Sequence, residues 1–168
     1  MLGRTAALCT AATAALTMTT ASPSHAQPAD GPDLTRLADR LERFLTPEAA
    51  VAEGYLPDLR CVESPAGVMG HHYTNPDLVD GKVKKNRPEV LLYQPTGPDG
   101  ALRLAAVEYL VPADLAKDHP DLKGVPFEGP MPGHGPGMPV HYDLHVWLFQ
   151  SNPNGPYATW NPTGTCGD

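Results

Sequence analysis

The 168-residue sequence lacks several motifs that would assign a function directly. It contains no Gly-x-Ser-x-Gly nucleophile elbow and no glycine-rich phosphate loop that leads from a strand into a helix. Positive charge is also scarce, because 12 lysines and arginines stand against 19 acidic residues. Nucleic-acid binding requires a basic face. These absences argue against a serine hydrolase, a nucleotide-binding domain and a nucleic-acid partner.

Long apolar runs are missing too, apart from a short one near the N-terminus. Arg4, the apolar residues 6–18 and the small-x-small site Ser24-His25-Ala26 predict a secretory signal peptide over residues 1–26. The run is too short and too rich in threonine for a stable transmembrane helix, and an uncleaved anchor is the alternative. We expect residues 27–168 to form a single globular domain that is secreted or periplasmic, with no stable membrane span.

Cysteine is rare, with three in the sequence, and Cys9 lies within the predicted signal. The exported chain would therefore keep Cys61 and Cys166. An even number of cysteines in an exported protein indicates a disulfide, although two free thiols or a soft metal site are alternatives. Closing a loop of about a hundred residues would stabilise the fold by roughly 4–5 kcal/mol in the chain-entropy model.

The order of the elements predicts an α+β fold. Leucines at helical spacing from Leu34 to Leu45 predict a helix with Pro32 in its first turn, and a second short helix should start at Thr46 and end at Gly54. Strands are expected over residues 68–73, 88–93, 101–111 and 140–150, with the middle two forming a hairpin. The expected fold is N-terminal helices packed on a small, mainly antiparallel sheet, flat or curled, with a long Pro/Gly-rich loop over residues 117–139.

The candidate site lies on the last predicted strand. Alternate residues of a strand point to the same side, so one side of residues 140–150 is aliphatic. The other side carries His141, Asp143, His145 and Trp147. Imidazole and carboxylate ligands suit zinc, copper, manganese and iron alike, whereas the pattern His-Glu-x-x-His is absent. We predict a zinc or copper site with ligands drawn from His72, His141, His145, Glu108 and Asp143.

Other residues are expected to line a pocket at this site, namely His71, Tyr73, His134 and Trp147. Methionine thioethers would favour copper, and three methionines lie close to the histidines in sequence, although packing is their more common role. Glu108 poses a geometric problem. It shares its predicted face with Leu102, Leu104 and Leu110, which should point to the core and away from the histidines. A β-bulge or a curled sheet would reconcile the two.

Two other functions remain open at this point. The first is a metal-free domain that binds a small molecule through its histidine and aromatic side chains, with a histidine available as a general base. The second is an envelope or interaction protein in which the Pro/Gly-rich loops form the functional surface and the histidines are structural. The sequence leaves open whether the protein is an enzyme.

Overall fold

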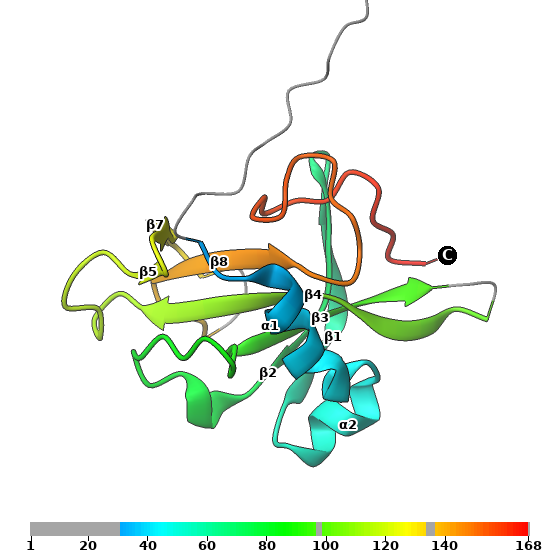
Figure 1. Ribbon diagram of the computed structural model, residues 1–168, viewed down its shortest axis with the longest axis horizontal. Helices are drawn as coiled ribbons and strands as arrows, with labels where there is room; N and C mark the ends of the chain where they lie inside the picture. The colour runs from blue at the N-terminus through cyan, green and yellow to red at the C-terminus, as the bar shows by residue number, and fades with distance from the viewer. Residues whose placement is uncertain (1–30, 97–98, 134–136, 168) are drawn as a thin grey trace, which may run out of the picture.

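The computed structural model describes residues 31–96, 99–133 and 137–167, so the predicted signal peptide and His134 lie outside the described residues. Within these ranges, an antiparallel sheet with the strand order β1-β2-β3-β4-β8-β7 forms the body of the protein (Figure 1). Its strands are β1 (Leu56–Ser64), β2 (Gly67–Thr74), β3 (Val90–Thr96), β4 (Ala101–Pro112), β7 (Glu128–Met131) and β8 (His141–Trp147). A separate ribbon pairs β5 (Asp121–Leu122) with β6 (Val125–Pro126). The predicted α+β class with an antiparallel sheet is confirmed.

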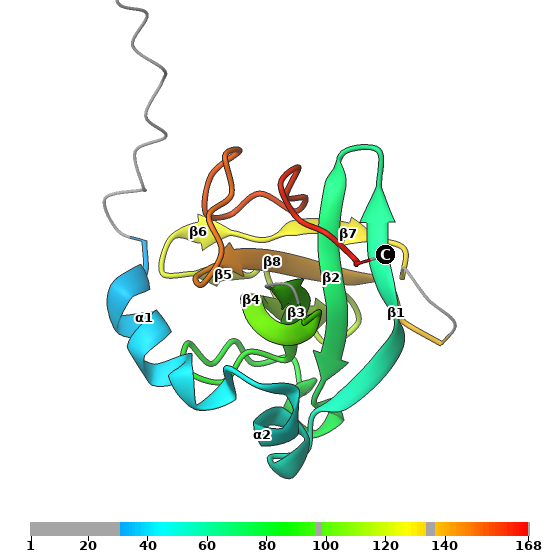
Figure 2. The same cartoon turned by 90° about the vertical axis from the view of Figure 1, so that its right-hand side faces the viewer.

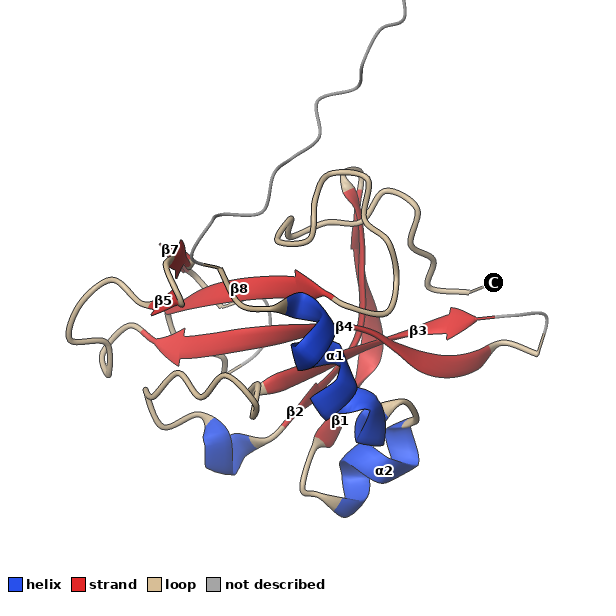
Figure 3. Cartoon of the chain, in the orientation of Figure 1, coloured by secondary structure: helices blue, strands red, loops and turns tan. Residues whose placement is uncertain are grey.

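Short helical segments precede the sheet (Figure 3). They are α1 (Leu34–Leu41), the 3-10 turn η1 (Glu42–Phe44) and α2 (Pro47–Ala52), and a further 3-10 turn, η2 (Pro76–Leu78), follows β2. The Asp33 carboxylate caps α1 by accepting a hydrogen bond from the Arg36 amide at 3.0 Å. Pro32 therefore precedes the cap instead of lying in the first turn. The Tyr93 hydroxyl of β3 donates to the Phe44 carbonyl at 2.6 Å, which ties η1 to the sheet.

Both faces of the central strands β3, β4 and β8 are buried, each in its own apolar cluster. The larger cluster contains side chains from α1, η1, β3, β4 and β8, among them Leu37, Leu41, Phe44, Leu91, Tyr93, Leu104, Val107, Tyr109, Leu144 and Val146. The smaller cluster contains Val90, Leu92, Ala105, Ala106, Leu110 and Trp147. The second face is therefore not solvent-exposed, and polar groups placed on it are desolvated.

A β-bulge at Ala105 decides which residues of β4 face each cluster. Leu92 pairs with Ala106 while Tyr93 pairs with Leu104, so the register skips Ala105. The prediction that Leu104 and Glu108 share a face was wrong, because one inserted residue reverses the alternation of side chains along a strand. Leu104 joins the larger cluster, whereas Glu108 lies on the face of the smaller one.

The sheet is strongly curled, and β1 and β2 run steeply across β7 and β8 in Figure 2. Strand β1 was not predicted, since its proline and charged residues hide the alternation. The C-terminal segment lies against this part of the sheet through an isolated bridge between Val68 and Asn161 and through a Cys61–Cys166 disulfide, with the two Cα atoms 5.7 Å apart. The predicted disulfide is confirmed. No helix in the described part of the chain is long and apolar enough to cross a membrane.

The segment predicted as one irregular loop, residues 117–139, contains β5, β6 and β7. Strand β7 pairs with β8 across an irregular register that joins Glu128 to Asp143 and Met131 to His141. Backbone pairing with a neighbouring strand, and not side-chain alternation, makes this short Gly- and Pro-containing segment extended. Sequence periodicity therefore could not reveal it.

Candidate metal centre

Three strands of the sheet, β2, β4 and β8, bring the predicted ligands to one face. Glu108 of β4 and His145 of β8 are directly opposite each other. Asp143 and His141 follow at alternate positions of β8. His72 of β2 pairs with Leu92, which pairs in turn with Ala106, two residues before Glu108. The Ala105 bulge thus resolves the predicted conflict between Glu108 and the histidines.

The outer group consists of His72, Glu108 and His145. The Nε2 atom of His72 lies 3.5 Å from Glu108 Oε2, and the Nε2 atom of His145 lies 3.9 Å from the same oxygen. Good hydrogen bonds from nitrogen to oxygen measure about 2.7–3.2 Å. Ligands around a tetrahedral metal with bonds of about 2.0–2.1 Å lie roughly 3.3–3.5 Å apart. The His72 separation therefore matches an edge of such a coordination sphere, whereas the His145 separation is longer than such an edge.

The inner group consists of Glu108, His141 and Asp143. His141 Nε2 lies 3.5 Å from Asp143 Oδ2, and the ligand atoms of this group, like those of the outer group, all lie within 4.8 Å of one another. The two groups share Glu108. They also approach each other at His145, whose Nδ1 lies 3.9 Å from Asp143 Oδ1.

Backbone carbonyls orient two of the histidine rings. His72 Nδ1 lies 3.2 Å from the Gly70 carbonyl oxygen, and His141 Nδ1 lies 3.0 Å from the Pro139 carbonyl oxygen. A ring that donates its Nδ1 proton to a carbonyl presents Nε2 as the metal-binding atom, which is the usual support for a histidine ligand. Gly70 is required here, because its φ is +112° and a Cβ would lie 2.6 Å from the Tyr93 carbonyl oxygen.

The site is rich in negative charge that water does not reach. Glu108 and Asp143 are 1% and 0% exposed. Glu108 Oε2 and both Asp143 oxygens accept no hydrogen bond from any described residue. Buried carboxylates normally have hydrogen-bond partners, an opposite charge or a metal ion. The arrangement thus has the donors and the electrostatic demand of a cation site.

Burial and neighbouring carboxylates set the proton affinities here. Burial raises the pKa of Glu108 well above its usual range, and the charges of Asp143 and Glu89 raise it further. Burial also raises the pKa of Glu89 to about 7, although its carboxylate accepts a hydrogen bond from the Leu110 amide at 3.1 Å. Burial lowers the pKa of His141, but Asp143 and the Pro139 carbonyl outweigh it, so the net shift is upward.

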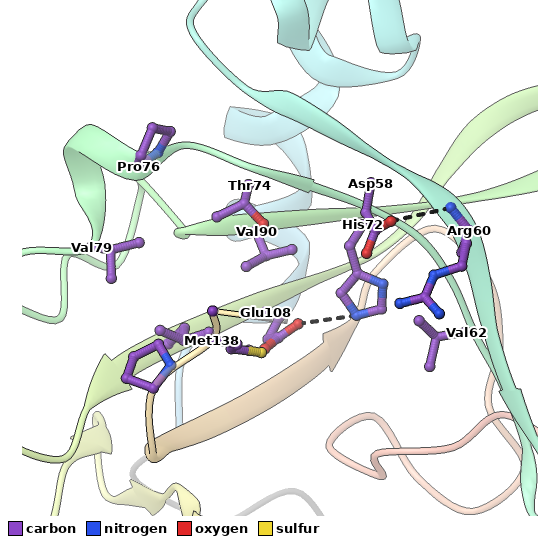
Figure 4. Close-up of a pocket in the computed structure, with 13 residues that line it drawn as sticks. Asp58, Arg60, Val62, His72, Thr74, Pro76, Val79, Val90, Glu108 and Met138 are labelled. Carbon is purple, nitrogen blue, oxygen red and sulfur yellow. Dashed lines mark hydrogen bonds and ion pairs between the residues drawn. The ribbon is translucent and has the colours of Figure 1, made fainter. Parts of the chain in front are cut away.

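A pocket of about 580 Å³ opens over the outer group (Figure 4). His72 and Glu108 contribute to its lining, whereas His145 of the outer group, His141 and Asp143 do not. The segment 137–139, which belongs to the predicted functional loop, forms part of the wall. Asp58, Arg60 and Val62 of β1 line the pocket as well, and sequence reasoning missed them. Their i, i+2, i+4 spacing was the available signal.

No family model, curated protein or solved structure matches this chain. The chemistry of the site must therefore be argued from its own geometry.

Three of the residues predicted to line the pocket, His71, Tyr73 and Trp147, are not among its lining residues. Tyr73 packs in the larger cluster, with its ring centroid 4.8 Å from that of Tyr93. Trp147 is buried in the smaller cluster, and its indole nitrogen donates to the Ala158 carbonyl at 2.6 Å. His71 is half-buried on β2 and does not line the described pocket. The alternation of β2 explains this, since adjacent residues point to opposite faces.

Proposed function

We propose that this protein is an exported metalloprotein in which the outer group binds one transition-metal ion at the base of the pocket. The observation that carries the proposal is the convergence of two imidazole Nε2 atoms, from His72 and His145, on the same buried oxygen of Glu108. That oxygen accepts no hydrogen bond from the described residues, so it is available to bind a cation that both rings also bind.

Three protein ligands leave a coordination position for a water molecule or a small ligand, as in catalytic zinc sites. A metal at this point would act as a Lewis acid and lower the pKa of a bound water. The chain's own residues prepare the site. His72 and His145 supply neutral donors, Glu108 supplies the compensating charge, and the pocket admits a small molecule. We therefore favour a metal-dependent enzyme that acts on a small molecule.

Zinc and copper are the metals we propose. Two imidazoles and one carboxylate match zinc enzymes with a His₂Glu ligand set. Copper has separate support from Met138, which lines the pocket together with Glu108, because a thioether is a soft donor (Figure 4).

Export is part of the proposal. It is supported by the signal-like pattern of residues 1–26 and by the Cys61–Cys166 disulfide, which is compatible with an oxidising compartment. In this proposal, residues 27–168 form a single domain, and the N-terminal helices are a structural cover for the larger apolar cluster. Their polar faces carry no part of the site.

Metal analysis of the purified protein tests the central claim, with His72→Ala as the variant and His71→Ala as its matched control. The two histidines are adjacent on β2, but only His72 belongs to the outer group. We expect the unmodified protein and the His71→Ala variant to bind zinc or copper equally, and the His72→Ala variant to bind less. Equal metal content in both variants would contradict the proposal.

Metal-free binding of a small molecule is the second candidate. It is favoured by the pocket itself, which the exposed Arg60 of β1 lines together with His72 (Figure 4). A guanidinium at this position suits a small organic anion. Binding of an organic anion that survives complete removal of metal, and that is lost in the Arg60→Ala variant, would support this candidate over the first.

A further inference from the structure

We propose that the inner group binds a second cation and that Glu108 bridges the two ions. This proposal rests on the proposed function of the outer group. Glu108 belongs to both groups, and the ligand atoms within each group lie within 4.8 Å of one another. Two-metal sites in enzymes hold their ions about 3.5–4 Å apart, and a shared carboxylate is a natural bridge at that spacing.

Asp143 is the residue that requires the second ion. Its side chain is 1% exposed, and neither carboxylate oxygen accepts a hydrogen bond from the described residues. An ion held by the outer group would neutralise Glu108, but Asp143 is not a member of that group. The buried charge of Asp143 therefore needs a cation of its own, since an isolated buried carboxylate is strongly disfavoured.

An imidazolium on His141 is the alternative source of positive charge, and the distances favour a metal instead. A charge-assisted hydrogen bond from nitrogen to a carboxylate measures about 2.7–2.9 Å. His141 Nε2 lies 3.5 Å from Asp143 Oδ2, which is close to the separation of two ligands on one metal. The Pro139 carbonyl, 3.0 Å from Nδ1, holds the ring with Nε2 toward the inner group.

The two ions would differ in access and in role. His141 and Asp143 are buried and do not line the pocket, whereas His72 and Glu108 do. The inner ion should therefore exchange slowly and the outer ion quickly. Two divalent ions against two carboxylates leave net positive charge, which favours a hydroxide or a small anion as the pocket-side ligand. A carboxylate or a phosphate ester is the class of molecule that this centre would bind.

Zinc titration of the full chain, with elemental analysis after removal of free metal, tests the second site. We expect two ions per chain in the unmodified protein and one ion in the Asp143→Asn variant. The His72→Ala variant should also bind one ion, but in this variant the ion that remains is the slowly exchanging inner one. Asp58→Asn is the matched control, because Asp58 lines the pocket outside both groups, and it should retain two ions.

The outcomes separate the two proposals. No bound metal in the unmodified protein would overturn both of them. One ion in the unmodified protein, unaffected by Asp143→Asn and lost in His72→Ala, would overturn the second site and leave the first intact. If Asp143→Asn does not fold, electron paramagnetic resonance of the Cu²⁺-loaded unmodified protein decides. Magnetic coupling between two Cu²⁺ ions would support the bridged centre, and a spectrum of isolated Cu²⁺ ions alone would contradict it.

Discussion

Glu108 and His145 are directly opposite each other on two neighbouring antiparallel strands, with Glu108 Oε2 and His145 Nε2 3.9 Å apart. Side chains opposite each other on one face of a sheet are held close by the backbone pairing itself. The pair is therefore part of the rigid sheet and does not depend on a mobile loop. A binding site built in this way is preorganised, because its ligands lose little conformational freedom when a metal binds.

Replacing Glu108 by glutamine should have opposite effects on the metal-free and metal-loaded protein. The metal-free variant should be more stable than the unmodified protein above neutral pH, because glutamine removes a buried carboxyl whose pKa is raised by burial. It should also lose the stabilisation that saturating zinc provides, about 3–4 kcal/mol at 100 to 1,000 times the dissociation constant. Thermal unfolding with and without zinc measures both effects.

Glu63→Gln is the control for this experiment. Glu63 is an exposed residue of β1 outside the candidate site, so its variant should match the unmodified protein in both conditions. An unchanged response of the Glu108→Gln variant to zinc would show that Glu108 is not a ligand.

Removal of the disulfide should destabilise the fold but spare the metal. The bond joins residues 105 positions apart, and the chain-entropy model predicts a loss of about 4–5 kcal/mol in the free energy of unfolding. The candidate ligands lie on β2, β4 and β8, whereas the cysteines lie on β1 and in the C-terminal segment. The Cys61→Ser, Cys166→Ser double variant should therefore unfold at lower denaturant concentration and still bind metal. Loss of metal from the folded double variant would show that metal binding depends on the disulfide, contrary to this prediction.

Strand alternation alone was enough to predict part of the site. Residues 141–147 form β8, and His141, Asp143 and His145 share the face that their spacing predicted. Local pattern carries this information because the side-chain period of a strand is independent of its neighbours. Which other residues meet that face depends on strand order and register, and these are set by long-range pairing.

Two features of the structure show where the local pattern is insufficient. The bulge at Ala105 moves Glu108 to the histidine face, and no residue type in that apolar run marks the position of the bulge. Strand β1 supplies Arg60 to the pocket, yet Val62 is the one residue of its sequence that belongs to the β-branched and aromatic types typical of strands. Both features arise from pairing with neighbouring strands, which sequence periodicity does not report.

Glu89 should make the protein less stable as pH rises. Its pKa is about 7 in the folded protein and 4.5 in the reference state, so the folded state retains a proton that the unfolded chain releases between these values. The contribution of this group is fully present below pH 4.5 and is lost as pH rises through about 7. Its upper limit is about 3 kcal/mol.

The Glu89→Gln variant tests this linkage in the metal-free protein. Its unfolding free energy should fall less than that of the unmodified protein between pH 4.5 and pH 8. Asp80→Asn gives a comparison of opposite sign, because the hydrogen bond from Lys84 lowers the pKa of Asp80. The stability from Asp80 is lost as pH falls. If the unfolding free energies of the Glu89→Gln variant and the unmodified protein change with pH in parallel, the raised pKa of Glu89 is ruled out.

Metal binding should release protons at neutral pH. Burial, with Asp143 and Glu89 nearby, raises the pKa of Glu108 well above its usual range, so the metal-free carboxyl holds its proton to higher pH than an exposed glutamate does. A metal binds the carboxylate and neutral imidazoles, so zinc must displace that proton, and binding should weaken as pH falls below about 6. Calorimetric titration with zinc in buffers of different ionisation enthalpy measures the protons released per ion, and we expect at least one. The His71→Ala variant should behave identically. A binding enthalpy that does not depend on the buffer would show that zinc binding releases no net proton, and it would contradict this prediction.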